Sequence, residues 1–288
     1  MMQRESYPAG VPCWVDTMQP DPDAATAFYG ALFGWEFENR APEGSPGPYY
    51  VARLRGSDVA AIGGPDESGS PFWSTYTSVK SADDTVARVR AAGGGVVVEP
   101  MEIFGVGRMA VFTDPEGAVF SAWEPDSFIG AQLVNEPGTW NFSELNTRTP
   151  DDAMRFYNEV FGWDTISVEV GASSFTFFTL GGYGDFLAQT NPAIRENQAA
   201  DGVTPGFEDA VAWLIDQRNE PDAAGSPPHW SVTFATDDAD DIATRAEQLG
   251  GKVIVPPFDA EPVRMTVIAD PQGAIFTASK YQPAGATT

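Results

Sequence analysis

Two stretches of nearly the same sequence decide the fold: DPDAATAFYGALFGWEF at residues 21–37 and TPDDAMRFYNEVFGWDT at residues 149–165. Asp21 and Thr149 are residue types that cap helix N-termini, and each is followed by a proline at the first helical position. Apolar side chains then recur four positions apart, and a glycine follows where a helix would end. We therefore expect two equivalent helices of about three turns, each docking through an aromatic stripe.

A second pair of matching stretches lies further along each half of the chain. GRMAVFTDPEGAVFSAWE at 107–124 parallels VRMTVIADPQGAIFTASK at 263–280. The central Asp-Pro-x-Gly is typical of a tight turn between two strands, so each stretch predicts a β-hairpin. A strand pattern and a helix pattern ending in glycines precede each hairpin. The order of strand, helix and further strands thus occurs four times, which predicts an α+β fold of four βαβββ modules.

The repeat also predicts the domain organisation. We expect a first domain over residues 8–126, a linker over 127–137 and a second domain over 138–282. The two halves differ most at residues 190–209, a polar insertion with no counterpart in the first half. A long connection in one copy only is typical of a lid or an interface element.

The composition excludes several classes of partner. The 288 residues include 41 acidic and 16 basic side chains, a formal charge of −25, which repels nucleic acids and anionic membranes. A single cysteine, Cys13, excludes an intramolecular disulfide. No apolar run approaches the ~20 residues that span a bilayer, and the first residues lack a hydrophobic signal core. We expect a soluble, cytoplasmic protein.

The ordered, duplicated set of an opening strand, an FYxxxFGW helix end and a DPxG hairpin resembles the vicinal oxygen chelate (VOC) superfamily. This superfamily includes glyoxalase I, extradiol dioxygenases and bleomycin-resistance proteins. With CWVD at the start, the chain looks most similar to a tandem actinobacterial glyoxalase-like subgroup that includes mycobacterial culture-filtrate antigens. The resemblance covers nearly the whole chain. It implies two tandem VOC domains, each of two βαβββ modules that form a cupped mixed sheet, and a cup that holds a divalent metal or an organic ligand. It also implies a monomer or weak homodimer, because one chain already contains the four modules that single-domain relatives assemble by dimerising.

The metal-ligand positions that the resemblance implies hold other side chains here. Fourteen residues before each helix FY, and seven after each hairpin aspartate, the sequence has Trp14, Phe142, Ser121 and Thr277 in place of histidine and glutamate. The remaining histidine position falls on Phe72 or Trp73 in the first half and on His229 or Trp230 in the second. Zinc or iron needs about three well-placed protein ligands. We therefore expect no metal and no other cofactor.

Because residues two apart on a strand share a face, the same strands predict what lines each cup. In the first cup the predicted ligand-binding residues are aromatic and hydroxyl side chains with one acid: Trp14, Asp16, Ser74, Tyr76, Ser121 and Trp123. In the second cup they are Phe142, Ser231 and Thr277, beside Trp140 and Thr233. Apolar walls with a few polar groups are typical of a pocket for organic molecules. The same aromatics can also fill a cup as ordinary core, and for the first half both interpretations stay open.

His229 and Glu144 are the candidate catalytic residues of the second cup, as an acid and base pair. His229 follows two prolines at a strand start, where surface and capping histidines are common. Cys13 precedes Trp14, so alternation predicts a buried thiol on the helix side of the sheet.

These features favour a metal-independent protein that binds an aromatic or apolar metabolite or antibiotic in a cup. An enzyme of the glyoxalase or dioxygenase type with an atypical site is the alternative. A structural or partner-binding protein with both cups filled is the third possibility.

Overall fold

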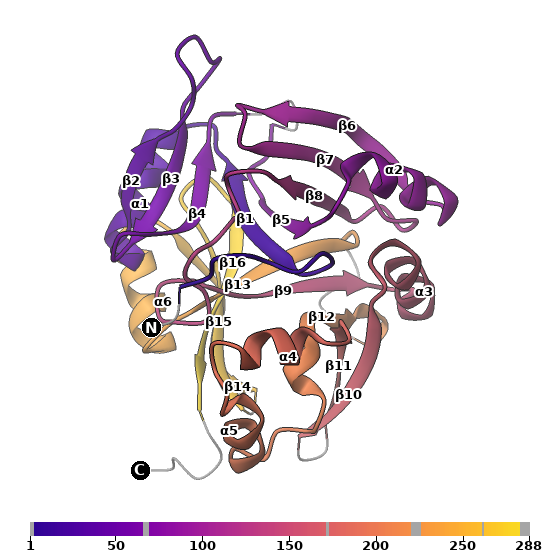
Figure 1. Ribbon diagram of the computed structural model, residues 1–288. Coiled ribbons are helices and arrows are strands. Elements are labelled where there is room, and N and C mark those ends of the chain that lie inside the picture. Colours follow the sequence, from indigo (N-terminus) through magenta and orange to yellow (C-terminus); the bar gives the residue numbers. More distant parts are fainter. Residues whose placement is uncertain (1–2, 66–68, 171–172, 220–225, 261, 283–288) are drawn as a thin grey trace.

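The structure is a computed structural model that describes residues 3–65, 69–170, 173–219, 226–260 and 262–282. Within these residues each half of the chain forms one eight-stranded mixed sheet (Figure 1). The elements of the first half are β1 (Pro12–Met18), α1 (Pro22–Phe33), β2 (Glu36–Asn39), β3 (Tyr49–Leu54), β4 (Ser57–Gly63), β5 (Trp73–Ser78), α2 (Ala82–Ala91), β6 (Gly95–Ile103), β7 (Gly107–Thr113) and β8 (Val119–Pro125).

The second half repeats this order and adds an insertion. Its repeated elements are β9 (Trp140–Thr147), α3 (Pro150–Phe161), β10 (Asp164–Val170), β11 (Ser173–Thr179), β12 (Ala210–Asp216), β13 (His229–Ala235), α6 (Ala239–Gln248), β14 (Lys252–Ala260), β15 (Val263–Ala269) and β16 (Ile275–Tyr281). Between β11 and β12 lie α4 (Tyr183–Ala188), α5 (Ile194–Ala200) and the short 3-10 helix η1 (Phe207–Asp209), and a second short 3-10 helix, η2 (Gln217–Asn219), follows β12. The insertion predicted from the sequence is therefore partly helical and begins directly after β11.

The strand order is β2-β3-β4-β1-β5-β8-β7-β6 in the first sheet and β10-β11-β12-β9-β13-β16-β15-β14 in the second. Within each module the first and last strands are parallel neighbours, and the two modules meet through an antiparallel pair, β1 with β5 or β9 with β13. This topology confirms the predicted α+β fold of tandem domains, each made of two βαβββ modules.

The repeated helices α1 and α3 end alike but begin differently. Both stop at a glycine in the left-handed region, Gly34 with φ 75° and Gly162 with φ 76°. The Asp21 carboxylate accepts a hydrogen bond from the backbone N–H of Ala24 at 3.0 Å, as a cap should. The prediction that Thr149 caps α3 in the same way is wrong, because its hydroxyl instead donates to Glu116 of the first domain at 3.0 Å.

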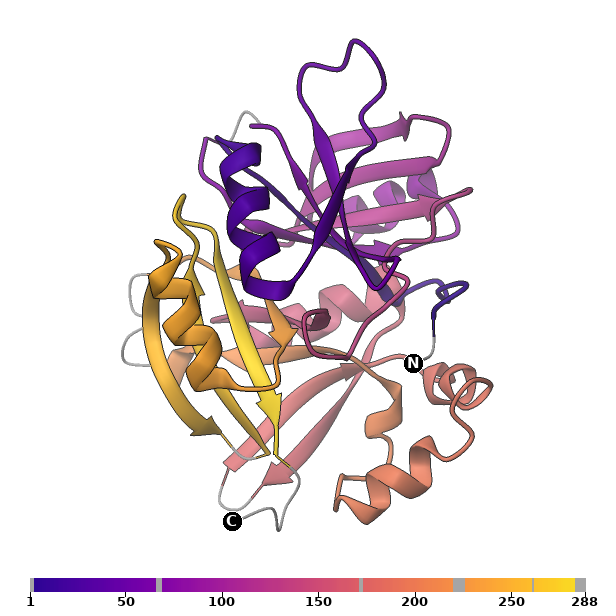
Figure 2. The same ribbon diagram turned by 90° about the vertical axis from the view of Figure 1, so that its left-hand side faces the viewer.

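The aromatic stripe of each helix packs against the other domain rather than only against its own sheet. The Tyr29 hydroxyl on α1 donates to Asp270 of the second domain at 2.9 Å, and the Tyr157 hydroxyl on α3 donates to Asp114 of the first at 3.2 Å. Figure 2 shows α1 beside the module that contains α6 and β16. The repeated stretch thus joins a helix of one domain to the DPxG turn of the other.

A bulge at the start of β1 and of β9 interrupts the alternation of faces. The register shifts between Pro12 and Trp14 in the first sheet and at the equivalent point after Trp140 in the second. Cys13 consequently packs in the same buried cluster as Trp14, and Trp140 packs in the cluster that covers the outer, helix-bearing faces. The predictions that Cys13 faces the helices and that Trp140 lines the second cup are therefore wrong.

None of the helices in the described residues is both long and apolar enough to cross a membrane.

Candidate ligand-binding site on the second sheet

Each sheet has an outer face covered by helices and an inner face, which we call its cup. Aligned through the strand register, the two cups carry a buried carboxylate at the same place, Asp16 on β1 and Glu144 on β9. Each lies directly opposite a serine of the neighbouring strand, Ser74 or Ser231. The Trp230 indole donates to Tyr157 of α3, so Trp230 lies on the outer face of its sheet. Its neighbour on the strand, His229, therefore lies on the inner side, at the position that Phe72 holds before Trp73 in the first half.

The first cup brings its predicted residues together but is filled. Trp14, Asp16, Tyr76, Ser121 and Trp123 each have an exposed fraction of 6 % or less, whereas Ser74 is partly exposed. Their close packing matches the interpretation of this cup as ordinary core.

A hydrogen-bond network holds the first cup closed from within. The Asp16 carboxylate accepts from the hydroxyls of Tyr49 at 2.9 Å and Tyr76 at 3.1 Å, and the Trp14 indole donates to Tyr49 at 3.1 Å. Burial, followed by the charge of Asp16, raises the pKa of both tyrosines. These tyrosines therefore stay neutral and serve as donors to the carboxylate.

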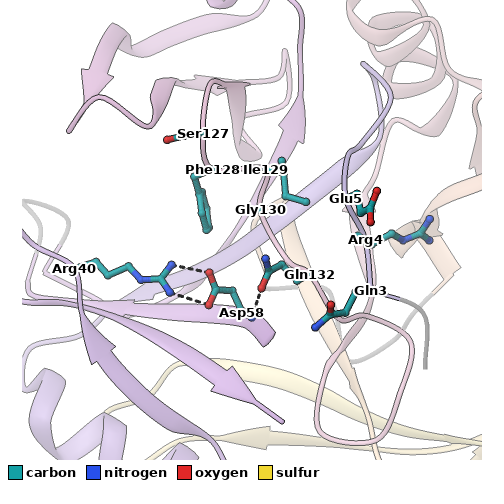
Figure 3. A pocket seen from close by; sticks show the side chains of 10 residues that line it. All are labelled: Gln3, Arg4, Glu5, Arg40, Asp58, Ser127, Phe128, Ile129, Gly130 and Gln132. Carbon is teal, nitrogen blue, oxygen red and sulfur yellow. Dashed lines mark hydrogen bonds and ion pairs between the residues drawn. The ribbon is translucent and has the colours of Figure 1, made fainter. Parts of the chain in front are cut away.

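The segment between the two sheets closes the first cup from outside. Phe128 packs edge-on against Trp14 with ring centroids 4.9 Å apart, and its carbonyl accepts from the Trp123 indole at 2.7 Å. A pocket of about 320 Å³ remains beyond Phe128 (Figure 3). Asp58 lines it and already accepts from both terminal nitrogens of the Arg40 guanidinium, at 2.6 and 3.0 Å. Asp58 and Arg40 thus neutralise each other, and Arg4 and Glu5 are further charged side chains that line this pocket.

The second cup differs because a row of side chains across four strands is partly exposed around its carboxylate. Phe177 on β11 is opposite Trp213 on β12, Trp213 is opposite Glu144, and Glu144 is opposite Ser231. In the first cup the same row reads Val51, Ala61, Asp16 and Ser74, with the two aliphatic residues fully buried. The Phe177 and Trp213 rings stack with centroids 5.8 Å apart and remain partly exposed.

The next row along the strands also differs between the two cups. Phe142, Thr233 and Thr277 lie abreast, where the first cup has Trp14, Tyr76 and Ser121. Thr233 replaces the ring of Tyr76 with a small hydroxyl side chain. Where the Tyr76 hydroxyl bonds Asp16 in the first cup, the Thr233 hydroxyl bonds Glu144 in the second, and the Phe142 ring packs edge-on against Phe177.

Glu144 is the polar centre of this surface. It is 3 % exposed, accepts from the Ser231 hydroxyl at 2.8 Å and is also bonded by the Thr233 hydroxyl. Asn146 in turn donates to Ser231 at 2.9 Å, which fixes that serine. Desolvation raises the pKa of Glu144 to about 7, against the opposing effect of the two hydroxyl donors. Glu144 can therefore be a neutral acid or an anion near neutral pH.

His229 lies at the edge of the same surface and is not bonded to Glu144 within the described residues. Its Nδ1 is 2.9 Å from the carbonyl of Pro227, and its partner across the strands is Asn146 rather than Glu144. The structure thus separates the predicted acid and base pair by two register positions, and Glu144 is hydrogen-bonded to hydroxyls rather than to imidazole.

Sequence reasoning missed the aromatic side of the second cup. Phe175, Phe177 and Trp213 belong to it, together with Phe207 from the insertion. The alternation of phenylalanines in SSFTFFT at 173–179 was a signal for an aromatic face, since side chains two apart share a face. Nothing in the sequence places Phe207 beside them.

The side chains at the VOC metal positions do not form a metal site. The positions at which the resemblance implies histidine and glutamate ligands hold Trp14, Phe142, Ser121 and Thr277, and a tryptophan or phenylalanine ring cannot ligate zinc or iron. Among residues the structure describes, no group of three His, Cys, Asp or Glu side chains is arranged to hold a metal ion.

Comparison with known proteins identifies the class to which this fold and these cups belong. The model of the glyoxalase/bleomycin resistance protein/dioxygenase superfamily matches residues 14–121 and 140–277. The chain belongs to this superfamily.

The relatives share its tandem arrangement. CFP32 of Mycobacterium tuberculosis, provisionally named a glyoxylase, is 38% identical over 98% of this chain and 99% of its own. The anthracycline biosynthesis protein DauV of Streptomyces sp. strain C5 is 30% identical over 96% of both chains. These matches confirm the resemblance to mycobacterial glyoxalase-like proteins.

Solved structures share the fold at much lower identity. The Mn(II)-bound glyoxalase from Novosphingobium aromaticivorans has a TM-score of 0.58 and 17% identity, over 94% of this chain and 82% of its own. The 2,3-dioxygenase LapB from Pseudomonas sp. KL28 has a TM-score of 0.59 and 12% identity, over 97% and 96%. Likeness at this level of identity concerns the fold alone.

Proposed function

We propose that the protein binds a small, flat aromatic molecule in its second cup without a protein-bound metal. One observation carries this proposal: the buried carboxyl of Glu144 lies in one row with the partly exposed rings of Trp213, on the neighbouring strand, and Phe177, one strand further on. Aromatic rings bind a flat ligand by stacking, and one polar group among apolar walls orients it. Relatives named for anthracycline biosynthesis are consistent with this class, because anthracyclines are polycyclic aromatic compounds.

The protonation of Glu144 gives the proposed site a pH dependence. A protonated carboxyl donates a hydrogen bond to a carbonyl of the ligand, whereas a carboxylate repels it. Because the pKa of Glu144 is about 7, its carboxyl group is mostly protonated and can donate at pH 6, and it is mostly ionised at pH 8.5. Binding of a carbonyl-containing aromatic should therefore weaken with rising pH.

Calorimetric titration with 1-hydroxyanthraquinone tests the proposal. We expect saturable binding that is about tenfold weaker after Trp213→Ala, because a stacking surface is lost. Phe72→Ala, at the exposed edge of the first cup, serves as the control and should leave binding unchanged. Glu144→Gln should bind equally at pH 6 and pH 8.5, since the amide donates at both. Absence of binding to the wild type, or a stoichiometric metal ion in the purified protein, would refute the proposal.

A second candidate is an isomerase or lyase of the glyoxalase type. The observation that favours it is the buried carboxyl of Glu144, bonded by the hydroxyls of Ser231 and Thr233. Burial raises its pKa to about 7, which suits a group that accepts and returns a proton near neutrality. The provisional name of CFP32 points to the same reaction class. Turnover of methylglyoxal with a thiol by the wild type, lost in Glu144→Gln, would support this candidate. No turnover by the wild type would exclude it, and equal turnover by both proteins would exclude Glu144 as its acid and base.

A further inference from the structure

The insertion between β11 and β12 contributes one ring to the second cup. Phe207, on η1, packs edge-on against Phe177 with ring centroids 5.0 Å apart and an interplanar angle of 88°. The preceding Gly206 lies against Ile166 of β10, the register partner of Phe177. Phe207 therefore stands at the outer end of the row that runs from Glu144 through Trp213 to Phe177.

Hydrogen bonds and ion pairs hold the short helix that carries Phe207 in place. The Asp209 carboxylate accepts from the Gly184 N–H at 2.6 Å, and the Asp209 carbonyl accepts from the Leu180 N–H at 2.9 Å. Glu208 pairs with Arg195 at 2.8 Å. Phe207 is thus a fixed wall rather than a freely moving flap.

The insertion also reaches the opposite half of the same sheet. Asp201, which follows α5, is hydrogen-bonded to the side chain of Tyr281. Partial burial of Tyr281 and, secondly, this neighbouring carboxylate raise the pKa of its hydroxyl. Tyr281 ends β16, so the insertion touches both modules of the second domain. Figure 1 shows its helices α4 and α5 in front of the second sheet. The first half joins β3 directly to β4 through a short turn and has no equivalent wall.

The distance from the polar centre to this wall follows from the strand spacing. Glu144 and Phe177 are two strands apart, and neighbouring strands lie about 4.8 Å from each other, so the row is roughly 10 Å long. Resting on the proposed function, we infer that Phe207 sets the length of the aromatic ligand: it admits a flat ring system whose polar end meets Glu144 and blocks longer ones.

The test compares two probes of different length, 2-naphthol and 1-hydroxyanthraquinone. Phe207→Ala removes the wall, so the affinity for the longer probe relative to the shorter one should rise about tenfold. Phe207→Trp extends the wall and should shift the same ratio in the opposite direction. Phe186→Ala is the matched control, because Phe186 lies on the same insertion but packs against Tyr183 and Arg4.

The outcomes separate this inference from the proposed function. A ratio that moves in opposite directions in the two Phe207 variants and stays constant in Phe186→Ala supports the inference. If the wild type binds the probes but both Phe207 variants keep the wild-type ratio, the inference is wrong and the proposed function stands. If the wild type binds neither probe, both are wrong. Circular dichroism of each variant identifies an unfolded protein, in which case Phe207→Leu replaces the alanine variant and should change the ratio in the same direction.

Discussion

Glu144→Gln should make the protein more stable at alkaline pH. The substitution keeps the size of the side chain and removes the charge. The hydroxyls of Ser231 and Thr233, which now bond the carboxyl group, can accept hydrogen bonds as well as donate them, so they can also bond the amide. The main difference between the two proteins is therefore the cost of a buried charge.

The size of the effect follows from the pKa. Glu144 titrates at about 7 in the folded protein, compared with an ordinary value of 4.5. Below pH 4.5 both states bind the proton and the burial of Glu144 is not penalised. Between pH 4.5 and 7 the unfolded chain releases its proton first, so stability falls as the pH rises, and above 7 the loss is complete. Each pH unit corresponds to about 1.4 kcal/mol, so the full loss is about 3 kcal/mol.

Urea denaturation at pH 5 and pH 8.5 measures this difference directly. We expect Glu144→Gln to exceed the wild type by about 1 kcal/mol at pH 5 and by about 3 kcal/mol at pH 8.5. Glu159→Gln, at an exposed position on α3, controls for the general effect of removing one negative charge and should show no such widening. If the difference in the free energy of unfolding between Glu144→Gln and the wild type is equal at both pH values, the pKa of Glu144 is not raised by folding. The pH dependence proposed for ligand binding would then be wrong as well.

Three further substitutions test the architecture, each by its effect on the free energy of unfolding. Tyr29→Phe should cost about 2 kcal/mol, because its hydroxyl bonds the other domain and accepts from a buried indole; no loss would exclude that role. Phe128→Ala should also cost about 2 kcal/mol, less than a fully buried ring, and shift tryptophan emission to longer wavelength by admitting water to the first cup; unchanged emission would contradict the closure of that cup. Gly130→Ala and Gly117→Ala both place alanine at φ 103°, but only at Gly130 would the new Cβ lie 2.2 Å from a backbone oxygen. Gly130→Ala should therefore lose at least about 2 kcal/mol more than Gly117→Ala, and equal losses would refute the close approach.

The fold could be predicted from the sequence because its signals are local and occur twice. A helix that ends at Gly34 or Gly162, and a turn built on Asp114 or Asp270, depend on residues close together in the chain. Their order was enough to define four modules. What the repeat did not reveal is that helix and turn pair across the two domains, since a sequence pattern carries no information about which copy is the partner.

The candidate site was less predictable because it depends on register and on distant segments. A single bulge turned Trp140 away from the second cup, although strict alternation had placed it inside. The first cup is closed by Phe128, from the connection between the sheets, and the second receives Phe207 from the insertion. Glu144 lies on the inner face, as strand alternation predicts, but its hydrogen-bond partners are the hydroxyls of Ser231 and Thr233, whereas the His229 ring lies against the Pro227 carbonyl.

The outer faces of the two sheets join the domains and the inner faces form the cups, which explains how the side chains of the two cups could come to differ. The outer faces carry the repeated aromatic helices, and their reciprocal bonds from Tyr29 and Tyr157 join the domains in the same way in both copies. Within the described residues these two bonds come from the helices on the outer faces, so a change at Asp16 or Glu144 on an inner face need not disturb them. In one cup the carboxylate at the shared position is enclosed by two tyrosines, and in the other it is bonded by small hydroxyls beside partly exposed rings. Burial of Asp16 or Glu144 costs free energy in either copy, and in each the hydrogen bonds of neighbouring hydroxyls offset part of that cost. If the proposed function is right, a ligand that bonds Glu144 would offset more of it in the second cup.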